Sequence, residues 1–165
     1  MSTTSIKKAK ENKLFYVVAT GTIYHPLLKK CLILQRSKTE IVHPLSWGVV
    51  GGKLEWGDFS EDTMTRMNGD VPNWEGACEK LLIREAYEES GLTVSDPRYL
   101  SSVGFIRPDG IPVMCLQFAV KWEKGEVIIP SEFEAYAWVD NESVKKYETM
   151  KGIEEGILQT LNHYS

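Results

Sequence analysis

The stretch around which this sequence is organised carries three glutamates within five positions, Arg84-Glu85-Ala86-Tyr87-Glu88-Glu89-Ser90-Gly91-Leu92. Its pattern predicts the end of a helix, with Glu85, Glu88 and Glu89 at i, i+3 and i+4 on one side. Carboxylates in the last turns oppose the helix dipole by about 0.3–1 kcal/mol each. The like-charged pair Glu85 and Glu89 adds about 0.2–0.5 kcal/mol. A cluster that breaks a local rule in this way often marks a functional site.

Three carboxylates on one side suit a hard divalent cation, Mg²⁺ or alternatively Mn²⁺. Zinc is not indicated, because no His or Cys falls at ligand spacing. On the helix alone, a solvated acidic face is an equal alternative. A second segment favours the metal hypothesis, because Gly51-Gly52 follows a short apolar run, residues 46–50. Paired glycines let the backbone approach a ligand closely and expose a carbonyl that could reach the metal.

Working outward, the acidic segment belongs to a predicted helix from Trp74 to Ser90. Asn73 is placed to cap its N-terminus, and Gly91 to cap its C-terminus in a left-handed conformation. Before the helix, residues 59–73 show no clean periodicity and are predicted to be an irregular surface excursion. One helical turn is expected within it, near Glu61–Met67.

Alternating and β-branched patterns predict the strands Leu14–Thr20 (continuing towards Tyr24), Lys30–Arg36, Tyr99–Ile106, Val113–Val120, Glu126–Ile129 and Ala135–Val139. The first two are expected to form a hairpin, and a turn is expected at residues 108–110. Residues 37–45 are predicted to be a loop. Two further helices are predicted near Glu142–Glu148 and Ile153–His163. Strands, one central helix, strands and a final helix predict a mixed α/β sandwich.

The 165 residues are enough for one domain, assigned to residues 14–165 behind a polar N-terminal tail, Met1–Lys13. A net charge of −4 argues against nucleic-acid binding. No apolar run of about 18 residues predicts a membrane span. The three widely spaced cysteines, Cys31, Cys78 and Cys115, indicate free thiols in a reducing compartment, and a cytoplasmic location is expected.

Together the two segments resemble the signature of the Nudix hydrolase (MutT-like) family. That signature runs Gly, five residues, Glu, seven residues, then Arg-Glu-apolar-x-Glu-Glu-x-Gly-apolar. Residues 84–92 match its second part at every position. Gly52 followed by Asp58 matches the first part with Asp in place of Glu. The preceding residues are also similar, although the usual proline before the glycine pair is Val50 here.

The spacing departs from the signature. Gly52 and Arg84 lie 84 − 52 = 32 positions apart, whereas the pattern has 14, so 18 extra residues lie inside the motif. An insertion of this kind is tolerable, because each doubling of loop length costs only about 0.6 kcal/mol. It leaves open whether Asp58, Glu75 or Glu79 supplies the first acidic position of the motif.

The resemblance implies a Nudix-type α/β/α sandwich with a mixed central sheet. It also implies Mg²⁺-dependent hydrolysis of a diphosphate bond in a nucleoside diphosphate linked to another group. The linked molecule would be a nucleoside triphosphate, an ADP-ribose-like nucleotide sugar or a dinucleoside polyphosphate. A small-molecule nucleotide is the implied partner, with neither nucleic acid nor membrane. A homodimer is compatible with the sequence, which does not decide the oligomeric state.

The resemblance also assigns roles to individual residues. Glu88 and Glu89 would be the main metal ligands, with the Gly51 carbonyl, and Glu85 would be a ligand or the general base. Arg84 would orient Glu85 through a charge-assisted hydrogen bond. The remaining candidates are an assisting glutamate, Glu132 in preference to Glu134, and the residues expected to contact substrate, Lys53, Trp56 and Arg36, with Glu55 near them.

Two other functions fit a Nudix-like sequence. A non-catalytic nucleotide-sensing domain is the main alternative, although such a sensor has no need of the whole set in residues 84–89. An isopentenyl diphosphate isomerase would need a catalytic Cys and Glu, and none of the three cysteines lies in a recognisable motif for it. Pro108 is interpreted as a turn proline, rather than as the proline of the ADP-ribose-cleaving subgroup.

Overall fold

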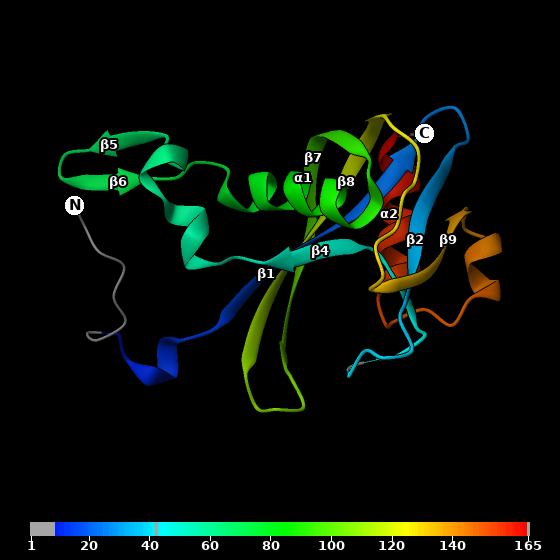
Figure 1. The fold of residues 1–165 in the computed structure, drawn as a ribbon, viewed down its shortest axis with the longest axis horizontal. Coiled ribbons are helices and arrows are strands. Elements are labelled where there is room, and N and C mark those ends of the chain that lie inside the picture. Colours follow the sequence, from blue (N-terminus) through cyan, green and yellow to red (C-terminus); the bar gives the residue numbers. More distant parts are fainter. Residues whose placement is uncertain (1–8, 42, 165) are drawn as a thin grey trace.

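The computed structural model describes residues 9–41 and 43–164, in which a mixed β-sheet lies between two α-helices (Figure 1). The main sheet contains β1 (Tyr16–His25), β2 (Lys30–Arg36), β3 (Trp47–Gly48), β4 (Val50–Lys53), β7 (Thr93–Ile106), β8 (Pro112–Lys124) and β9 (Phe133–Val139). The helices are α1 (Ala77–Ser90) and α2 (Ile153–Tyr164). Short 3₁₀ turns occupy Glu11–Lys13, Trp56–Phe59, Glu61–Thr63 and Ser143–Lys146.

The order of the main path through the sheet is β3-β2-β1-β8-β7, with β4 also paired to β1 and β9 to β2. The central pair, β1 and β8, is parallel, and the other pairs are antiparallel. Within this sheet β1 and β2 form the expected hairpin, with Tyr24 opposite Cys31. The sheet is therefore mixed, as the resemblance implied.

The two helices cover opposite faces of this sheet. A Cβ atom on Gly21 of β1 would lie 2.6 Å from Leu82 of α1, whereas the Cβ position of Gly156 in α2 faces the hydroxyl of Thr22. Neighbouring residues of a strand point to opposite faces, so Gly21 and Thr22 mark the two sides. The predicted α/β/α sandwich is confirmed.

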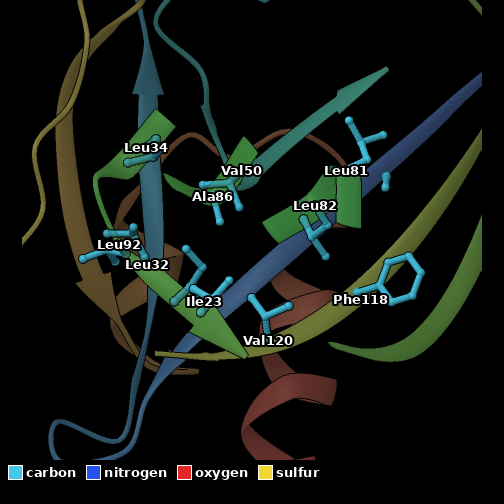
Figure 2. Packing of buried hydrophobic residues seen from close by; sticks show 12 residues of the cluster. Ile23, Leu32, Leu34, Val50, Leu81, Leu82, Ala86, Leu92, Phe118 and Val120 are labelled. Carbon is cyan, nitrogen blue, oxygen red and sulfur yellow. The ribbon is translucent and has the colours of Figure 1, made fainter. Parts of the chain in front are cut away.

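Each face has its own apolar cluster. Figure 2 shows the one beneath α1, built from Ile23, Leu32, Leu34, Val50, Leu81, Leu82, Ala86, Leu92, Phe118 and Val120. The cluster beneath α2 contains Tyr24, Cys31, Ile33, Val139, Val144 and Ile157. Because α1 is held along its buried stripe, its flank is fixed beside β4, and that flank carries the glutamates of the motif.

The start of α1 differs from the prediction. The helix begins at Ala77 instead of Trp74, and Gly76, at φ 65°, occupies the N-cap position. Asn73 ends strand β6 and caps nothing, because the chain leaves a hairpin at this point. The predicted end is confirmed, since Gly91 is left-handed at φ 72° and donates its N–H to the Tyr87 carbonyl.

The excursion before α1 is more ordered than predicted. After the turn at Glu61–Thr63, β5 (Arg66–Asn68) and β6 (Val71–Asn73) pair as a small hairpin. Figure 1 shows this hairpin projecting beyond the N-terminal end of α1. The helical turn expected near Glu61–Met67 is shorter in the structure. It covers Glu61–Thr63, whereas Arg66 and Met67 belong to β5.

Two downstream predictions also need correction. Residues 126–129 do not form a strand, because they run beside the end of α1, where Ile128 N–H donates to the Ser90 carbonyl. The helix predicted at Glu142–Glu148 is reduced to a 3₁₀ turn, Ser143–Lys146. The predicted N-terminal tail lies mostly outside the described residues, which begin at residue 9.

The cysteines and the helices bear on the compositional observations. Cys31, Cys78 and Cys115 are all free. Burial raises the pKa of the Cys31 thiol to about 12. No helix in the described ranges combines the length and the apolar character that a membrane crossing would require.

Candidate active site

Glu85 lies directly against the glycine pair, which forms part of strand β4 and not a turn, with Gly51 opposite Thr20 and Gly52 opposite Ala19 of β1. Its carboxyl carbon would be 2.3 Å from a Cβ atom on Gly52, so only glycine leaves room for this carboxylate. The side chain keeps 16% of its surface exposed. Burial raises the carboxyl pKa of Glu85, the Arg84 charge lowers it, and Glu88, Asp58 and Glu55 raise it again. The predicted approach of the two halves of the motif is thus seen at Gly52.

Arg84 holds three carboxylates around the site. Its guanidinium lies 3.2 Å from Asp58 Oδ1, 3.3 Å from Glu85 Oε1 and 3.5 Å from Glu88 Oε2. The expected contact between Arg84 and Glu85 is present. Because a guanidinium has a fixed planar set of donors, it also fixes where these carboxylates lie relative to one another.

Asp58, in the 3₁₀ turn Trp56–Phe59 that follows β4, is the acidic residue that lies beside Arg84. One of its oxygens accepts a hydrogen bond from the Glu55 N–H at 2.8 Å, while the other faces Arg84. Glu75 instead pairs with Arg66 of the hairpin, at 2.6 Å. Glu79, in the first turn of α1, lies with its Oε2 3.7 Å from the Cβ position of Gly76. Of the three candidates, Asp58 therefore has the position next to Arg84 and Glu85.

Glu89 is attached to the other glycine. The Gly51 N–H donates a hydrogen bond to Glu89 Oε2 at 2.9 Å. Burial raises the pKa of this carboxyl from 4.5 to about 7; the Gly51 hydrogen bond and the Arg36 charge lower it, and the Glu85 and Glu132 charges raise it further. The Gly51 carbonyl, which the resemblance assigns to the metal, remains a prediction.

Glu88 does not contact the glycine pair, unlike Glu85 and Glu89. Its side chain is 53% exposed and faces the guanidinium of Arg84. Within the parts of the chain that are described, no three His, Cys, Asp or Glu side chains form a ready-made metal site. The three glutamates share one flank of α1, as predicted, but Glu85 and Glu89 face the β4 glycines while Glu88 faces Arg84.

The residues present nevertheless fit a divalent cation. The Glu85 carboxylate occupies the space that a side chain at Gly52 would need. Glu89 accepts a hydrogen bond from the N–H of the adjacent Gly51. The Glu85 and Glu132 charges raise the pKa of Glu89, and the Glu88, Asp58 and Glu55 charges raise the pKa of Glu85, as expected where negative charges are crowded together. Carboxylate and carbonyl oxygens are the ligands that Mg²⁺ and Mn²⁺ prefer.

The two candidate assisting glutamates differ in their surroundings. Glu134 accepts hydrogen bonds from the Ser37 hydroxyl and the Lys38 N–H, at 3.3 and 3.2 Å, which hold it at the loop after β2. Glu132 carries a charge that raises the pKa of Glu89, so its carboxylate lies near the site. The preference for Glu132 agrees with this placement, and its role remains a prediction.

The expected substrate-contacting residues are divided between regions. Arg36, at the end of β2, pairs with Glu40 and lowers the pKa of Glu89, so it borders the carboxylates. Lys53 follows Gly52 in β4 and therefore points to the opposite face of the sheet, where its ammonium lies 5.9 Å from the Tyr16 ring centre. Trp56 is 56% exposed beyond the glycine pair.

Sequence reasoning missed Tyr16 and Arg107. The Arg107 guanidinium carbon lies 5.5 Å from the Tyr16 ring centre, so two cations flank one aromatic ring. The register β1–β4 and β1–β8 brings these segments together, and no local motif signals it. His25 stacks on Trp122, with the ring centres 4.3 Å apart.

Comparison with known proteins gives the class of fold. Neither a family model nor a curated protein matches the sequence. Among solved structures, the MutT protein from Methanosarcina mazei Go1 matches at TM-score 0.64 and 20% identity, covering 93% of this chain and 98% of that one. The NUDIX domain of Shewanella oneidensis NrtR, complexed with ADP ribose, matches at TM-score 0.66 and 15% identity, covering 96% and 93%.

A C. elegans Ap4A hydrolase, in a binary complex, matches at TM-score 0.61 and 16% identity, covering 90% of this chain and 96% of that one. These identities are low, but the matches extend over nearly the whole of both chains. The chain therefore has the fold of the MutT/Nudix hydrolases.

Proposed function

We propose that this chain is a Nudix-family pyrophosphohydrolase dependent on Mg²⁺ or Mn²⁺. Its substrate is a nucleoside diphosphate linked to another group, and the bond cleaved is a diphosphate bond. The main support for the proposal is that the Glu85 carboxylate occupies the space left by the missing side chain of Gly52. The carboxylate lies against the glycine pair and beside the Arg84 guanidinium, so the two halves of the sequence signature meet at this point.

In this proposal Glu85, Glu88, Glu89 and the Gly51 carbonyl are the residues that hold the cation. When bound, the cation neutralises phosphate oxygens and lowers the pKa of a coordinated water. Arg84 orients Glu85, which accepts the proton of the attacking water unless it serves as a ligand.

The residues around this centre would bind the substrate. Arg36 borders Glu89 and is placed to contact a phosphate oxygen, although it also pairs with Glu40. Glu132 is the second acid near Glu89 and is placed to assist as a ligand or base. Trp56 is exposed beyond the glycine pair and available for stacking with a nucleobase.

A nucleotide-sensing domain without hydrolysis is the second candidate. It is favoured by one observation, that Glu88 faces Arg84 and no three potential ligands converge among the residues described. The intact set of Arg84, Glu85 and Glu89 at the glycine pair favours hydrolysis instead, because sensing alone does not need a seated general base.

A substrate panel tests the choice. Nucleoside triphosphates, ADP-ribose and dinucleoside polyphosphates would be incubated with Mg²⁺ or Mn²⁺, and the products identified by chromatography and by ¹⁸O-water labelling. We expect metal-dependent release of nucleotide products, and its loss in Glu89→Gln and in Glu88→Gln. Glu75→Gln, at the pair with Arg66, is the matched control and should retain activity. Binding without any turnover would support the sensing domain.

A further inference from the structure

The insertion and α1 line an open pocket beside the candidate active site. Its volume is about 180 Å³. Trp74, Ala77 and Leu81 provide apolar walls, and the cations Lys80 and Arg84 line the same space. A water molecule occupies about 30 Å³ in the liquid, so the cavity has room for a group of several heavy atoms.

The walls of this cavity are ordered by the insertion itself. The Trp74 indole N–H donates to the Ser60 carbonyl at 2.9 Å, and Phe59 packs edge-on against the ring at 5.5 Å. The 3₁₀ turn that carries Thr63 is closed by the same segment. The 18 additional residues thus form one wall of a defined cavity, with α1 as the other.

The polar groups of the cavity leave hydrogen-bond donors available. Thr63 is engaged, because its hydroxyl donates to backbone carbonyls at 3.0 Å. Both oxygens of Asp58 already accept hydrogen bonds, from Glu55 N–H and Arg84. Lys80 makes one long contact, 3.4 Å to Thr65. An ammonium has three donors, so Lys80 retains capacity for an anion.

The cavity is also next to the proposed chemistry. Lys80 and Arg84 stand four residues apart on α1, and neighbours at this spacing lie about one turn, or about 5.4 Å, apart along a helix. The Arg84 guanidinium also contacts Glu85, at 3.3 Å. A substrate whose diphosphate lies at Glu85 could therefore extend a further anionic group past Arg84 to Lys80.

We propose that this cavity binds a phosphate group of the substrate that lies beyond the cleaved diphosphate, with Lys80 as its specificity-determining cation. The inference rests on the proposed function and narrows it. Substrates with three or more linked phosphates, such as a nucleoside triphosphate or a dinucleoside polyphosphate, gain this contact. ADP-ribose, whose second phosphate carries a neutral sugar, does not.

The first test measures binding without turnover. Inorganic triphosphate would be titrated calorimetrically into metal-free wild-type protein, Lys80→Ala, Ala77→Phe and a control, Lys145→Ala, whose lysine lies away from the cavity and pairs with Glu142. Loss of a charge-assisted hydrogen bond should weaken binding about tenfold in Lys80→Ala. Ala77→Phe fills the cavity and should weaken it similarly, whereas Lys145→Ala should match wild type.

The second test measures turnover of diadenosine tetraphosphate and ADP-ribose by the same variants. We expect Lys80→Ala to raise KM for diadenosine tetraphosphate about tenfold, with kcat and the KM for ADP-ribose unchanged. Equal KM values in wild type and Lys80→Ala would overturn the inference while leaving the proposed hydrolysis standing.

The two tests also separate the inference from the proposed function. If no substrate is hydrolysed but Lys80→Ala weakens triphosphate binding, hydrolysis fails and the anion site stands. If Lys80→Ala weakens triphosphate binding without changing either KM, the cavity binds an anion other than substrate, and its assignment to substrate is wrong. Thermal unfolding of each variant would show that Ala77→Phe remains folded.

Discussion

Gly52 is the residue at which the two halves of the motif depend on each other most directly. The carboxylate of Glu85 occupies the volume that any larger side chain at position 52 would need. This dependence is invisible in local sequence, because Gly52 and Glu85 lie 33 positions apart, 85 − 52. The glycine pair alone indicated only that the backbone can approach another group closely, and its combination with the acidic helix indicated a site.

Gly52→Ala should therefore abolish most activity without unfolding the protein. The new methyl group would lie 2.3 Å from the Glu85 carboxyl carbon, so this carboxylate must move by an ångström or more. A displacement of that size costs about 10²-fold in kcat/KM. Steady-state kinetics would measure it on the best substrate of the panel. Gly57→Ala is the matched control, because its Cβ meets nothing within 4 Å; equal activity in both variants would contradict the placement of Glu85.

Glu89 gives a prediction about pH and stability. Burial raises its carboxyl pKa from 4.5 to about 7 in the folded protein. Between these values the folded state binds more protons than the unfolded state, so the free energy of unfolding falls as pH rises. Glu89→Gln removes this decline and should stabilise the metal-free protein at pH 8 by about 2 kcal/mol, less than the full linkage value because some solvent reaches the group.

Urea denaturation in a chelator at pH 4.5 and pH 8 would measure this effect. Glu142→Gln is the control, since that side chain is 80% exposed and pairs with Lys145, and it should leave the pH profile as in wild type. A Glu89→Gln protein with the same pH dependence as wild type would show that the carboxyl is ordinary. The same comparison is informative about the site, because a residue kept at a cost to stability is typical of function.

At the scale of elements, the insertion shows where local patterns were sufficient and where they were not. Gly91 is a C-cap that the sequence identified correctly, because a left-handed cap needs glycine. The prediction of Asn73 as the N-cap was wrong, because Asn73 belongs to β6 and pairs with Arg66 of β5. Three-residue strands have too few positions to show a period, so the hairpin could not be predicted.

Trp74 holds the insertion against the start of α1. Trp74→Ala removes a hydrogen bond to the Ser60 carbonyl and an edge contact with Phe59. Together these contribute about 2 kcal/mol, so local opening should become at least about tenfold more frequent. Limited proteolysis should then cut within residues 59–73 correspondingly faster. Trp56→Ala, at a position 56% exposed, should leave the cleavage rate unchanged.

For the whole molecule, the predicted α/β/α class and most strands were right because each buried strand carries its own apolar or β-branched pattern. The strand predicted at residues 126–129 was wrong for a complementary reason, since those apolar residues pack beside the end of α1 instead of pairing in the sheet. Predicting that Lys53 and Glu85 lie on opposite faces of the sheet would also have required the register of β4 against β1. The four residues of β4 carry no pattern that determines this register.

The parallel pairing of β1 with β8 has a consequence for how the molecule is made. Val18 lies opposite Cys115, 115 − 18 = 97 residues later. During synthesis on the ribosome, β1 therefore emerges long before its parallel partner β8 is made. Pairings between segments so far apart in sequence slow folding. A fragment ending at residue 110 should show rapid hydrogen exchange at the β1 amides, whereas the full chain should protect them. Slow exchange in that fragment would mean that β1, β2 and β4 fold without β8.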